Sequence, residues 1–212
     1  MTVDIAGCRI KLLSEKALFF KKSKSLVIAD LHFGKINHFR RSGIPVPAKG
    51  NKSNSERLID LLNQTKPERT IFLGDLFHSH YNEEWEVLGQ ILKHFSQCSF
   101  ELVLGNHDIL SNLQYNRNNI DVVKKLEEGS IVLTHEPLKR IKNGSYNLSG
   151  HLHPGVRLSG KGRQSMTLPC FYFGEKMGLL PAFGSFTGFK RIVPKKNDRI
   201  FVVTDKKIVE VS

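Results

Sequence analysis

The sequence predicts an α/β fold in which two mixed sheets pack against one another. Short apolar runs bounded by Gly, Asp or Asn are typical of strands buried on both faces, and they occupy 26–29, 71–73, 102–104 and 131–133. Between them, apolar residues recur at helical spacing, which indicates βα units up to about residue 135. After residue 146, short strands joined by Gly and Pro turns predict a second, more antiparallel sheet.

Two helices and five later strands complete this prediction. The first helix, 55–65, has Ser53 or Asn54 in position to cap its start. The second, 83–95, has three acidic residues near its amino end, where the helix dipole favours negative charge. We interpret the apolar stripes of both helices as faces turned to the core. The later strands are expected at 156–158, 166–168, 171–173, 200–203 and 208–211.

Composition favours one folded domain spanning residues 1–212. With 40% apolar and 25% charged residues, the chain resembles neither a disordered nor a membrane protein. Asp4 and Arg9 interrupt the apolar segment that a secretory signal would need, so we expect a cytoplasmic protein. Three cysteines, far apart and in no CxxC spacing, favour reduced packing residues over disulfides or a thiolate zinc site.

Metal-binding residue types follow the apolar strands. In open α/β sheets the loops beyond the carboxyl ends of strands converge on one edge, so these side chains are expected to meet. Gly74, Gly105 and Gly150 each precede such a group, where a tight turn or a close backbone approach requires glycine. The candidate ligands are Asp30, His32, Asp75, Asn106, His135, His151 and His153.

The mixture of ligands indicates a dinuclear centre. Carboxylate and amide oxygens combined with imidazole nitrogens suit Mn²⁺, Fe or Zn²⁺ better than Ca²⁺ or Mg²⁺. Seven ligands exceed the needs of one open site, and a carboxylate can bridge two ions. We therefore expect two divalent metal ions, Mn²⁺ foremost and Fe or Zn²⁺ as alternatives.

The ordered blocks DLH, GDLFH, GNHD, TH and GHLH resemble those of the calcineurin-like metallophosphoesterase superfamily. This resemblance implies a four-layer α/β/β/α sandwich. It also implies one metal held by Asp30, His32, Asp75 and His153, and a second held by Asp75, Asn106, His135 and His151. Many relatives have Asp or Arg where this chain has His78, which leaves the role of His78 open.

A closer similarity extends beyond the ligand blocks. The segments DLHFGK, FRRSGIPVP, GDLFHSH, HEPL, GHLHPG, LPCF and LPAFGSFTGF are similar to the bacterial DNA ligase-associated phosphoesterases, the PdeM family of DNA damage response endonucleases. That similarity implies an endonuclease linked to DNA repair, with a DNA ligase or helicase as a partner.

The catalytic candidates are His107 and Asp108. Metal coordination lowers the pKa of water enough to supply hydroxide for attack on a phosphodiester. His107 lies beside a candidate ligand and is the best candidate to protonate the leaving oxygen. Asp108 would orient the imidazole of His107 and favour its charged form. The alternative interpretation of Asp108, a cap of a helix or turn after the strand, is compatible with this role.

The formal charge of +12 is concentrated beside the metal blocks. Residues 35–57, which include Arg40 and Arg41, and residues 139–163 are strongly basic and would follow a polyanionic backbone. Solvated faces of a basic protein are the alternative interpretation. Phe183, Phe186 and Phe189 are candidates for stacking on bases, or for packing, and His78 and His80 for phosphate contacts or a polar loop.

Three functions are compatible with these features. The first is a metal-dependent phosphodiesterase acting on DNA or RNA, which the basic segments favour. The second is a phosphodiesterase or phosphatase for small nucleotides, which a closed pocket would favour over an open groove. The third is a catalytically silent scaffold, and the intact set of ligands argues against it.

Overall fold

The computed structural model describes residues 1–35, 53–78, 80–160, 162, 164–185, 187–205 and 207–211. Its first sheet is mixed and has the order β1-β2-β3-β4-β5-β6-β7. Strands β1 to β4 pair antiparallel, and β4 to β7 pair parallel. The strands are β1 (Thr2–Ile5), β2 (Cys8–Leu13), β3 (Ala17–Phe20), β4 (Ser25–Ile28), β5 (Arg69–Leu73), β6 (Ser99–Val103) and β7 (Ile120–Val123).

The second sheet is also mixed, with the order β14-β11-β12-β13-β10-β9-β8, and β15 pairs with both β12 and β16. Strand β10 pairs parallel with β9 and β13, whereas β11 and β12 form an antiparallel hairpin. The strands are β8 (Leu126–Glu128), β9 (Ile131–Thr134), β10 (Tyr146–Ser149), β11 (Pro154–Ser159), β12 (Ser165–Phe173), β13 (Met177–Leu179), β14 (Lys190–Arg191), β15 (Arg199–Val203) and β16 (Ile208–Glu210).

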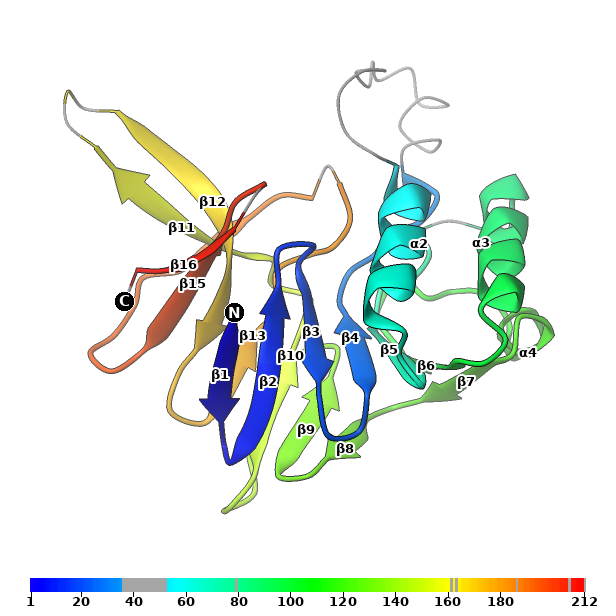
Figure 1. Ribbon diagram of the computed structural model, residues 1–212, viewed down its shortest axis with the longest axis horizontal. Helices are drawn as coiled ribbons and strands as arrows, with labels where there is room; N and C mark the ends of the chain where they lie inside the picture. Colours follow the sequence, from blue (N-terminus) through cyan, green and yellow to red (C-terminus); the bar gives the residue numbers. More distant parts are fainter. Residues whose placement is uncertain are drawn as a thin grey trace.

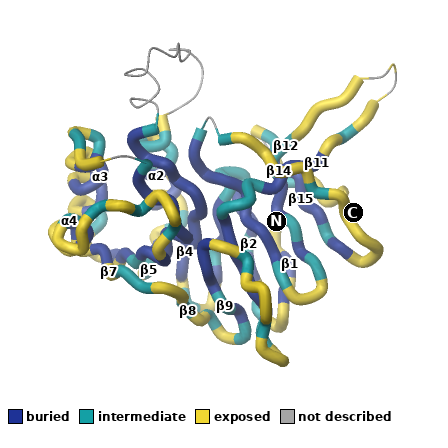
Figure 2. The backbone as a smooth tube through the Cα atoms, turned by 180° about the vertical axis from the view of Figure 1, so that it is seen from behind, coloured by how far each residue is buried: buried dark blue, intermediate teal, exposed yellow. Residues whose placement is uncertain are grey.

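The two sheets pack face to face around a shared apolar core (Figure 1). Buried side chains of β1 to β6 meet buried side chains of β9, β10, β12 and β15, which include Phe171 and Phe201. Figure 2 shows that the central strands of both sheets are buried along most of their length. Burial of apolar area from both sheets stabilises the sandwich.

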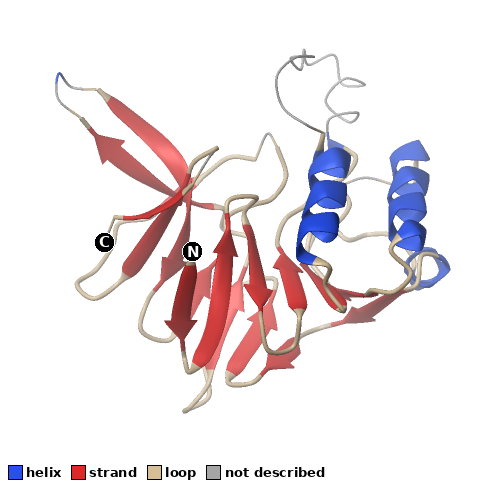
Figure 3. Cartoon of the chain, viewed as in Figure 1, coloured by secondary structure: helices blue, strands red, loops and turns tan. Residues whose placement is uncertain are grey.

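The helices of the described residues cover the other face of the first sheet (Figure 3). They are α2 (Asn54–Thr65), α3 (Glu83–His94) and α4 (Asn112–Arg117). Trp85 of α3 packs edge to face against Phe77 and Tyr115, and Leu58 and Leu61 of α2 are fully buried. None of these described helices is long and apolar enough to cross a membrane.

The prediction of an α/β fold with two mixed sheets is confirmed, and the described helices form one of the two helical layers that were expected. Within the described residues, no helix packs on the outer face of the second sheet. That face has a small cluster of buried apolar residues centred on Val156 and Cys170. The β11–β12 hairpin extends beyond the sandwich (Figure 1). The described part of the chain therefore has three layers, α/β/β.

Individual elements agree with the sequence patterns where apolar residues dominate. Both helices and the four buried strands lie within a few residues of their expected positions. The runs expected at 166–168 and 171–173 are one strand, β12, whose burial changes from exposed to buried along its length. The amino-terminal strands β1 to β3 were not predicted, although they form the edge of the first sheet.

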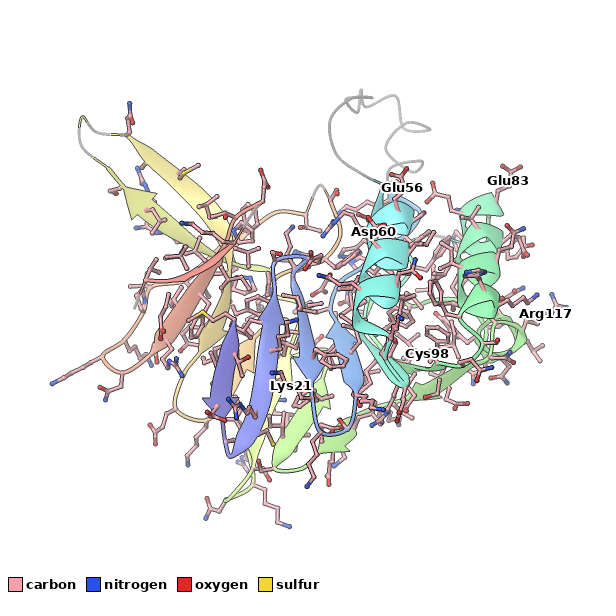
Figure 4. The ribbon with its side chains drawn as sticks, viewed as in Figure 1. Lys21, Glu56, Asp60, Glu83, Cys98 and Arg117 are labelled. Atoms are coloured by element: carbon pink, nitrogen blue, oxygen red, sulfur yellow. The ribbon has the colours of Figure 1, made fainter. Side chains whose placement is uncertain are left out.

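The amino end of α2 is fixed by a capping box. Ser53 Oγ accepts a hydrogen bond from the backbone N–H of Glu56 (3.2 Å), and the Glu56 carboxylate accepts one from the N–H of Ser53 (2.8 Å). Glu56 and Asp60 lie on the same helix (Figure 4). Because Asn54, the next residue, donates to the carbonyl of Leu31 (3.0 Å), this cap also supports the loop after β4.

Replacing Ser53 with Ala should lower the free energy of unfolding by about 1 kcal/mol, because one helix N–H loses its acceptor. Urea unfolding followed by circular dichroism measures this change. Gln64→Ala, an exposed substitution near the other end of α2, is the matched control and should leave stability unchanged. Equal unfolding midpoints for Ser53→Ala and the wild type would contradict the role of the cap.

Candidate metal centre

The candidate ligands lie on loops that follow β4, β5, β6, β9 and β10. The loops after β4 and β5 run side by side, because His32 donates its N–H to the carbonyl of Asp75 (2.9 Å) and Asp30 donates to Gly74 (3.2 Å). The loop after β10 joins them, since the N–H of His151 donates to the Asp30 carboxylate (2.9 Å). The two sheets are thereby connected at the edge where the ligands gather.

Five of the candidate ligands have a left-handed backbone. Their φ angles lie between +47° and +64°, a region that residues other than glycine rarely adopt. Such conformations cost free energy and persist where the surrounding structure imposes them. The residues are Asp30, His32, Asp75, His151 and His153.

The three glycines that precede ligand groups have close neighbours in this centre. A methyl group on Gly150 would lie 2.5 Å from Oδ2 of Asp30, and one on Gly105 would collide with the carboxylate of Asp75. A methyl group on Gly74 would collide with the ring of His135, and its φ of +76° also favours glycine. The predicted close approach of backbone to ligand side chains is confirmed at each position.

Asp30, His32 and His153 form one group whose ligand atoms lie within 4.8 Å of one another. Asp30 is fully buried, and Nε2 of His153 lies 3.3 Å from its Oδ1. Burial, reinforced by the positive charge of Lys35 and neighbouring imidazoles, lowers the pKa of His32 to about 2. His32 is therefore neutral at physiological pH, the form in which imidazole binds a metal.

Asp75, His135 and His151 form a second group of the same kind. Nδ1 of His135 lies 3.1 Å from the carbonyl of Leu73, an acceptor that requires the proton on Nδ1. This tautomer leaves Nε2 as a lone pair directed into the group. Nε2 lies 3.2 Å from Nδ1 of His151 and 3.1 Å from Oδ1 of Asn106, so Asn106 adjoins this group as expected.

Asp75 lies between the two groups. Its Oδ1 is 3.4 Å from Nε2 of His135, and its Oδ2 is 3.9 Å from Nε2 of His32. Each carboxylate oxygen therefore faces a different set of imidazoles. A carboxylate in this position would be able to contribute one oxygen to each of two ions.

Unsatisfied nitrogens test whether the centre fits metal ions. Both ring nitrogens of His32 and Nε2 of His153 are buried and have no hydrogen-bond partner. A buried polar atom without a partner is costly, and a divalent cation would satisfy such lone pairs. The donor set of carboxylates, imidazoles and one amide therefore fits two divalent ions.

The contacts of the Asp108 carboxylate are those of a turn cap. The hydrogen bonds of its carboxylate in the described structure reach backbone N–H groups, at distances of 2.8–3.4 Å, and not the ring of His107. Burial raises the pKa of Asp108 to about 6, although these bonds act in the opposite direction. The alternative interpretation, a cap of the turn, matches the geometry. The donors belong to Asp75, Leu76, Phe77 and Gly105.

His107 and His78 stand beside the first metal group. The ring centroid of His107 is 4.6 Å from that of His78 and 5.7 Å from that of His32. The backbone N–H of His107 donates to Oδ1 of Asp75 (2.9 Å), which fixes the residue next to the centre while its side chain stays exposed. His78 lines the same site, 5.3 Å from His32, whereas His80 is exposed.

Some of the residues predicted to bind substrate lie outside the described residues, and others are packed in the core. Arg40, Arg41 and Phe186 lie outside the described residues. Phe183 is fully buried in the core beneath α2, so it is unavailable for stacking on a base. The guanidinium of Arg57 lies 4.1 Å from the Phe183 ring centroid and donates to the Phe183 carbonyl, which removes this basic residue from the surface charge expected of 35–57.

Two residues near the centre, Lys35 and Gly184, were not predicted as part of it. Lys35, one of the residues of the basic segment 35–57, lies close to the centre. Burial lowers the pKa of Lys35, and the negative charges of Asp75 and Asp30 partly oppose this effect. Gly184 donates its N–H to the carbonyl of Asp30 (3.0 Å), and a methyl group there would lie 2.7 Å from the carbonyl oxygen of Leu31. This contact explains why glycine occupies position 184 in the segment LPAFGSFTGF. The neighbouring sequence does not indicate that Gly184 contacts the loop of Asp30.

Several solved structures are similar to this chain. The crystal structure of a Pseudomonas putida nuclease, MPE, is similar at 26% identity and a TM-score of 0.80, with 100% of this chain and 99% of that chain covered. A protein of unknown function from Aquifex aeolicus matches at 21% identity, covering 61% of this chain and 78% of that chain, with a TM-score of 0.41. A predicted phosphoesterase from Streptococcus pneumoniae matches at 15% identity, covering 88% and 86%, with a TM-score of 0.34. A search of curated proteins gave no match.

The model of the calcineurin-like phosphoesterase family matches residues 23–202, a span that includes each candidate ligand. Its extent agrees with the resemblance seen in the ligand blocks. The chain therefore belongs to the calcineurin-like phosphoesterase family, and it is a metal-dependent phosphoesterase.

Proposed function

We propose that this phosphoesterase is a nuclease that hydrolyses phosphodiester bonds of DNA or RNA with two divalent ions, Mn²⁺ foremost. The position of Asp75 between two groups of imidazoles is the observation on which the dinuclear assignment rests. The similarity to a solved nuclease over nearly the whole of both chains supports nucleic acid as the substrate. A role in DNA repair, with a ligase or helicase as partner, is proposed from the family resemblance.

The chain offers ligands for two ions. Asp30, His32 and His153 would hold the first, and Asn106, His135 and His151 the second, with Asp75 shared by both. Two such ions, when bound, supply a nucleophile at neutral pH and neutralise charge on the phosphate. The protein fixes the ligands before binding, since the Asp30 and Asp75 carboxylates each accept a hydrogen bond from a backbone N–H of another ligand loop.

His107 is the residue that we assign to the leaving group. Its imidazole is exposed at the edge of the first metal group, and its backbone is anchored to Asp75. From this position it donates a proton to the departing oxygen. Asp108 acts as a positioning residue, because its carboxylate holds the loop of Asp75 and the turn at Gly105 together. His78 adds a second imidazole on the same side for contact with the phosphate.

A substrate panel tests the proposal. The purified protein with Mn²⁺ is incubated with bis-p-nitrophenyl phosphate, cyclic nucleotides, single-stranded DNA, duplex DNA and RNA. Cleavage of a nucleic acid supports the nuclease assignment. Turnover of cyclic nucleotides without turnover of any nucleic acid would replace it with the small-nucleotide alternative, and inactivity toward all substrates would favour a scaffold.

Asp75→Asn should reduce both metal content and turnover. The amide keeps the shape of the side chain but loses the negative charge that two ions share, so we expect fewer than two bound ions per chain. Elemental analysis after dialysis measures the content, with Asp4→Asn at an exposed position of β1 as the control. Full occupancy in Asp75→Asn would contradict the bridging role.

Gly150→Ala should weaken metal binding by roughly 10- to 100-fold, because the added methyl group displaces the carboxylate of Asp30. Titration of the metal-free protein with Mn²⁺ gives the affinity. Gly160→Ala is the matched control, since a methyl group there meets nothing within 4 Å. Equal affinities for the two variants would show that the close approach at Gly150 is unimportant.

His107→Ala should retain both ions and the fold but lose roughly 100-fold or more in kcat on an unactivated phosphodiester. The loss should be smaller on bis-p-nitrophenyl phosphate, because p-nitrophenolate departs without a proton. His94→Ala at the exposed end of α3 serves as the control. An unchanged kcat on the unactivated substrate would refute the assignment of His107.

A further inference from the structure

The β11–β12 hairpin begins directly at the candidate metal centre. Pro154, its first residue, follows His153, and Lys190 of β14 donates its N–H to the carbonyl of His153 (3.1 Å). The hairpin then extends away from the sandwich (Figure 1). At about 3.3 Å per residue, Arg157 lies about 13 Å along the strand from His153. A polymer bound in the centre could therefore contact the hairpin as well.

One face of this hairpin is polar and basic. Alternate residues of a strand share a face, and strand pairing places Arg191 beside Gly155 and Thr167 beside Arg157. Arg157 donates to Ser165 Oγ across the hairpin (2.7 Å), which agrees with this assignment. The opposite face has the apolar side chains around Val156. We call the set of Arg157, Ser165, Thr167, Phe189 and Arg191 the ribbon face.

Phe189 adds an exposed aromatic ring to the ribbon face. A methyl group on Gly155 would lie 2.8 Å from Cβ of Phe189 and 3.0 Å from Cγ2 of Thr167, so Phe189 lies over the strand where glycine leaves room. The side chain is nevertheless 45% exposed. Because Gly155 is two residues beyond His153, this ring lies at the end of the ribbon face that adjoins the metal centre.

The segment that carries the ribbon face is predominantly basic. From His151 to Lys196 the sequence contains one acidic residue, Glu175, whereas β14 consists of two exposed basic residues. Figure 2 shows the outer part of the hairpin mostly exposed. Exposed arginines contribute little to folding, so their arrangement is not explained by stability. Since β14 is very short and charged at both positions, it is also poorly suited to pairing with a second copy of the chain.

We infer that the ribbon face binds the phosphate backbone of nucleic acid beyond the cleaved bond, with Phe189 stacked against a base. This inference rests on the proposed nuclease function and adds the surface that holds the substrate. Arg157 and Arg191 neutralise phosphates, and the ring of Phe189 contributes sequence-independent stacking. The ribbon face therefore acts on long substrates and leaves small diesters unaffected.

The test compares Arg157→Glu combined with Arg191→Glu against Lys21→Glu combined with Lys22→Glu. The control pair makes the same change of charge in the turn before β4. Asp30 follows the opposite end of β4, so the control residues lie away from the metal centre. Lys21 is labelled in Figure 4. Each protein is assayed with Mn²⁺ on a long oligonucleotide, single-stranded and duplex, and on bis-p-nitrophenyl phosphate. Metal content is measured by elemental analysis.

We expect the ribbon variant to lose about tenfold or more in kcat/KM on the long oligonucleotide, mainly through KM, and to show a weaker dependence on salt. Its turnover of the small diester and its metal content should remain unchanged. Phe189→Ala should lower kcat/KM on the oligonucleotide by about fivefold or more, whereas Phe189→Trp, which keeps an aromatic ring, should have kcat/KM close to that of the wild type.

The inference would be overturned if the ribbon and control variants lost the same factor in kcat/KM on the long oligonucleotide. It would also be overturned if the ribbon variant lost as much activity on bis-p-nitrophenyl phosphate as on the oligonucleotide. A wild-type protein that cleaves small diesters but no nucleic acid would instead refute the proposed function. Light scattering on each variant separates a third outcome: a change of oligomeric state in the ribbon variant alone would show that this face contacts a second copy.

Discussion

Two carboxylates, Asp30 and Asp75, are buried within one centre, and the loops around them are arranged to compensate their charge. Asp30 and Asp75 are almost fully inaccessible, and the imidazole of His32 beside them is held neutral by burial. Like charges in a medium of low polarity repel strongly and favour protonation unless cations or N–H donors compensate. The chain supplies the N–H donors from His151 and His107, and divalent ions would supply the positive charge.

This constraint explains why distant parts of the chain meet at one edge. Asp30 belongs to the first sheet and accepts its N–H from a loop of the second, so the carboxylate that would hold an ion also joins the two sheets. Asp108 does the same between the loops after β5 and β6, with backbone donors from both. Glycine at 74, 105 and 150 gives the space for these approaches. Scaffold and candidate site therefore share their hydrogen bonds.

Sequence predicted the elements whose signals are local. Apolar runs located β4, β5 and β6, and polar residues after the strands located the candidate ligands, because parallel strands place their carboxyl ends together. Long-range contacts left no such signal. The burial of Phe183 under Arg57, the contact of Gly184 with the loop of Asp30 and the binding of Asp108 to backbone depend on partners far away in the chain.

The left-handed turns at five candidate ligands also have a thermodynamic consequence. Each such conformation costs of order 1–3 kcal/mol, a noticeable part of the net stability of an ordinary domain. In the metal-free chain this cost lowers the free energy of unfolding, whereas ions that bind only the folded state raise it again by mass action. The folding equilibrium thus becomes linked to the concentration of free metal in the surroundings, and a cell short of that metal would hold a less stable population of this protein.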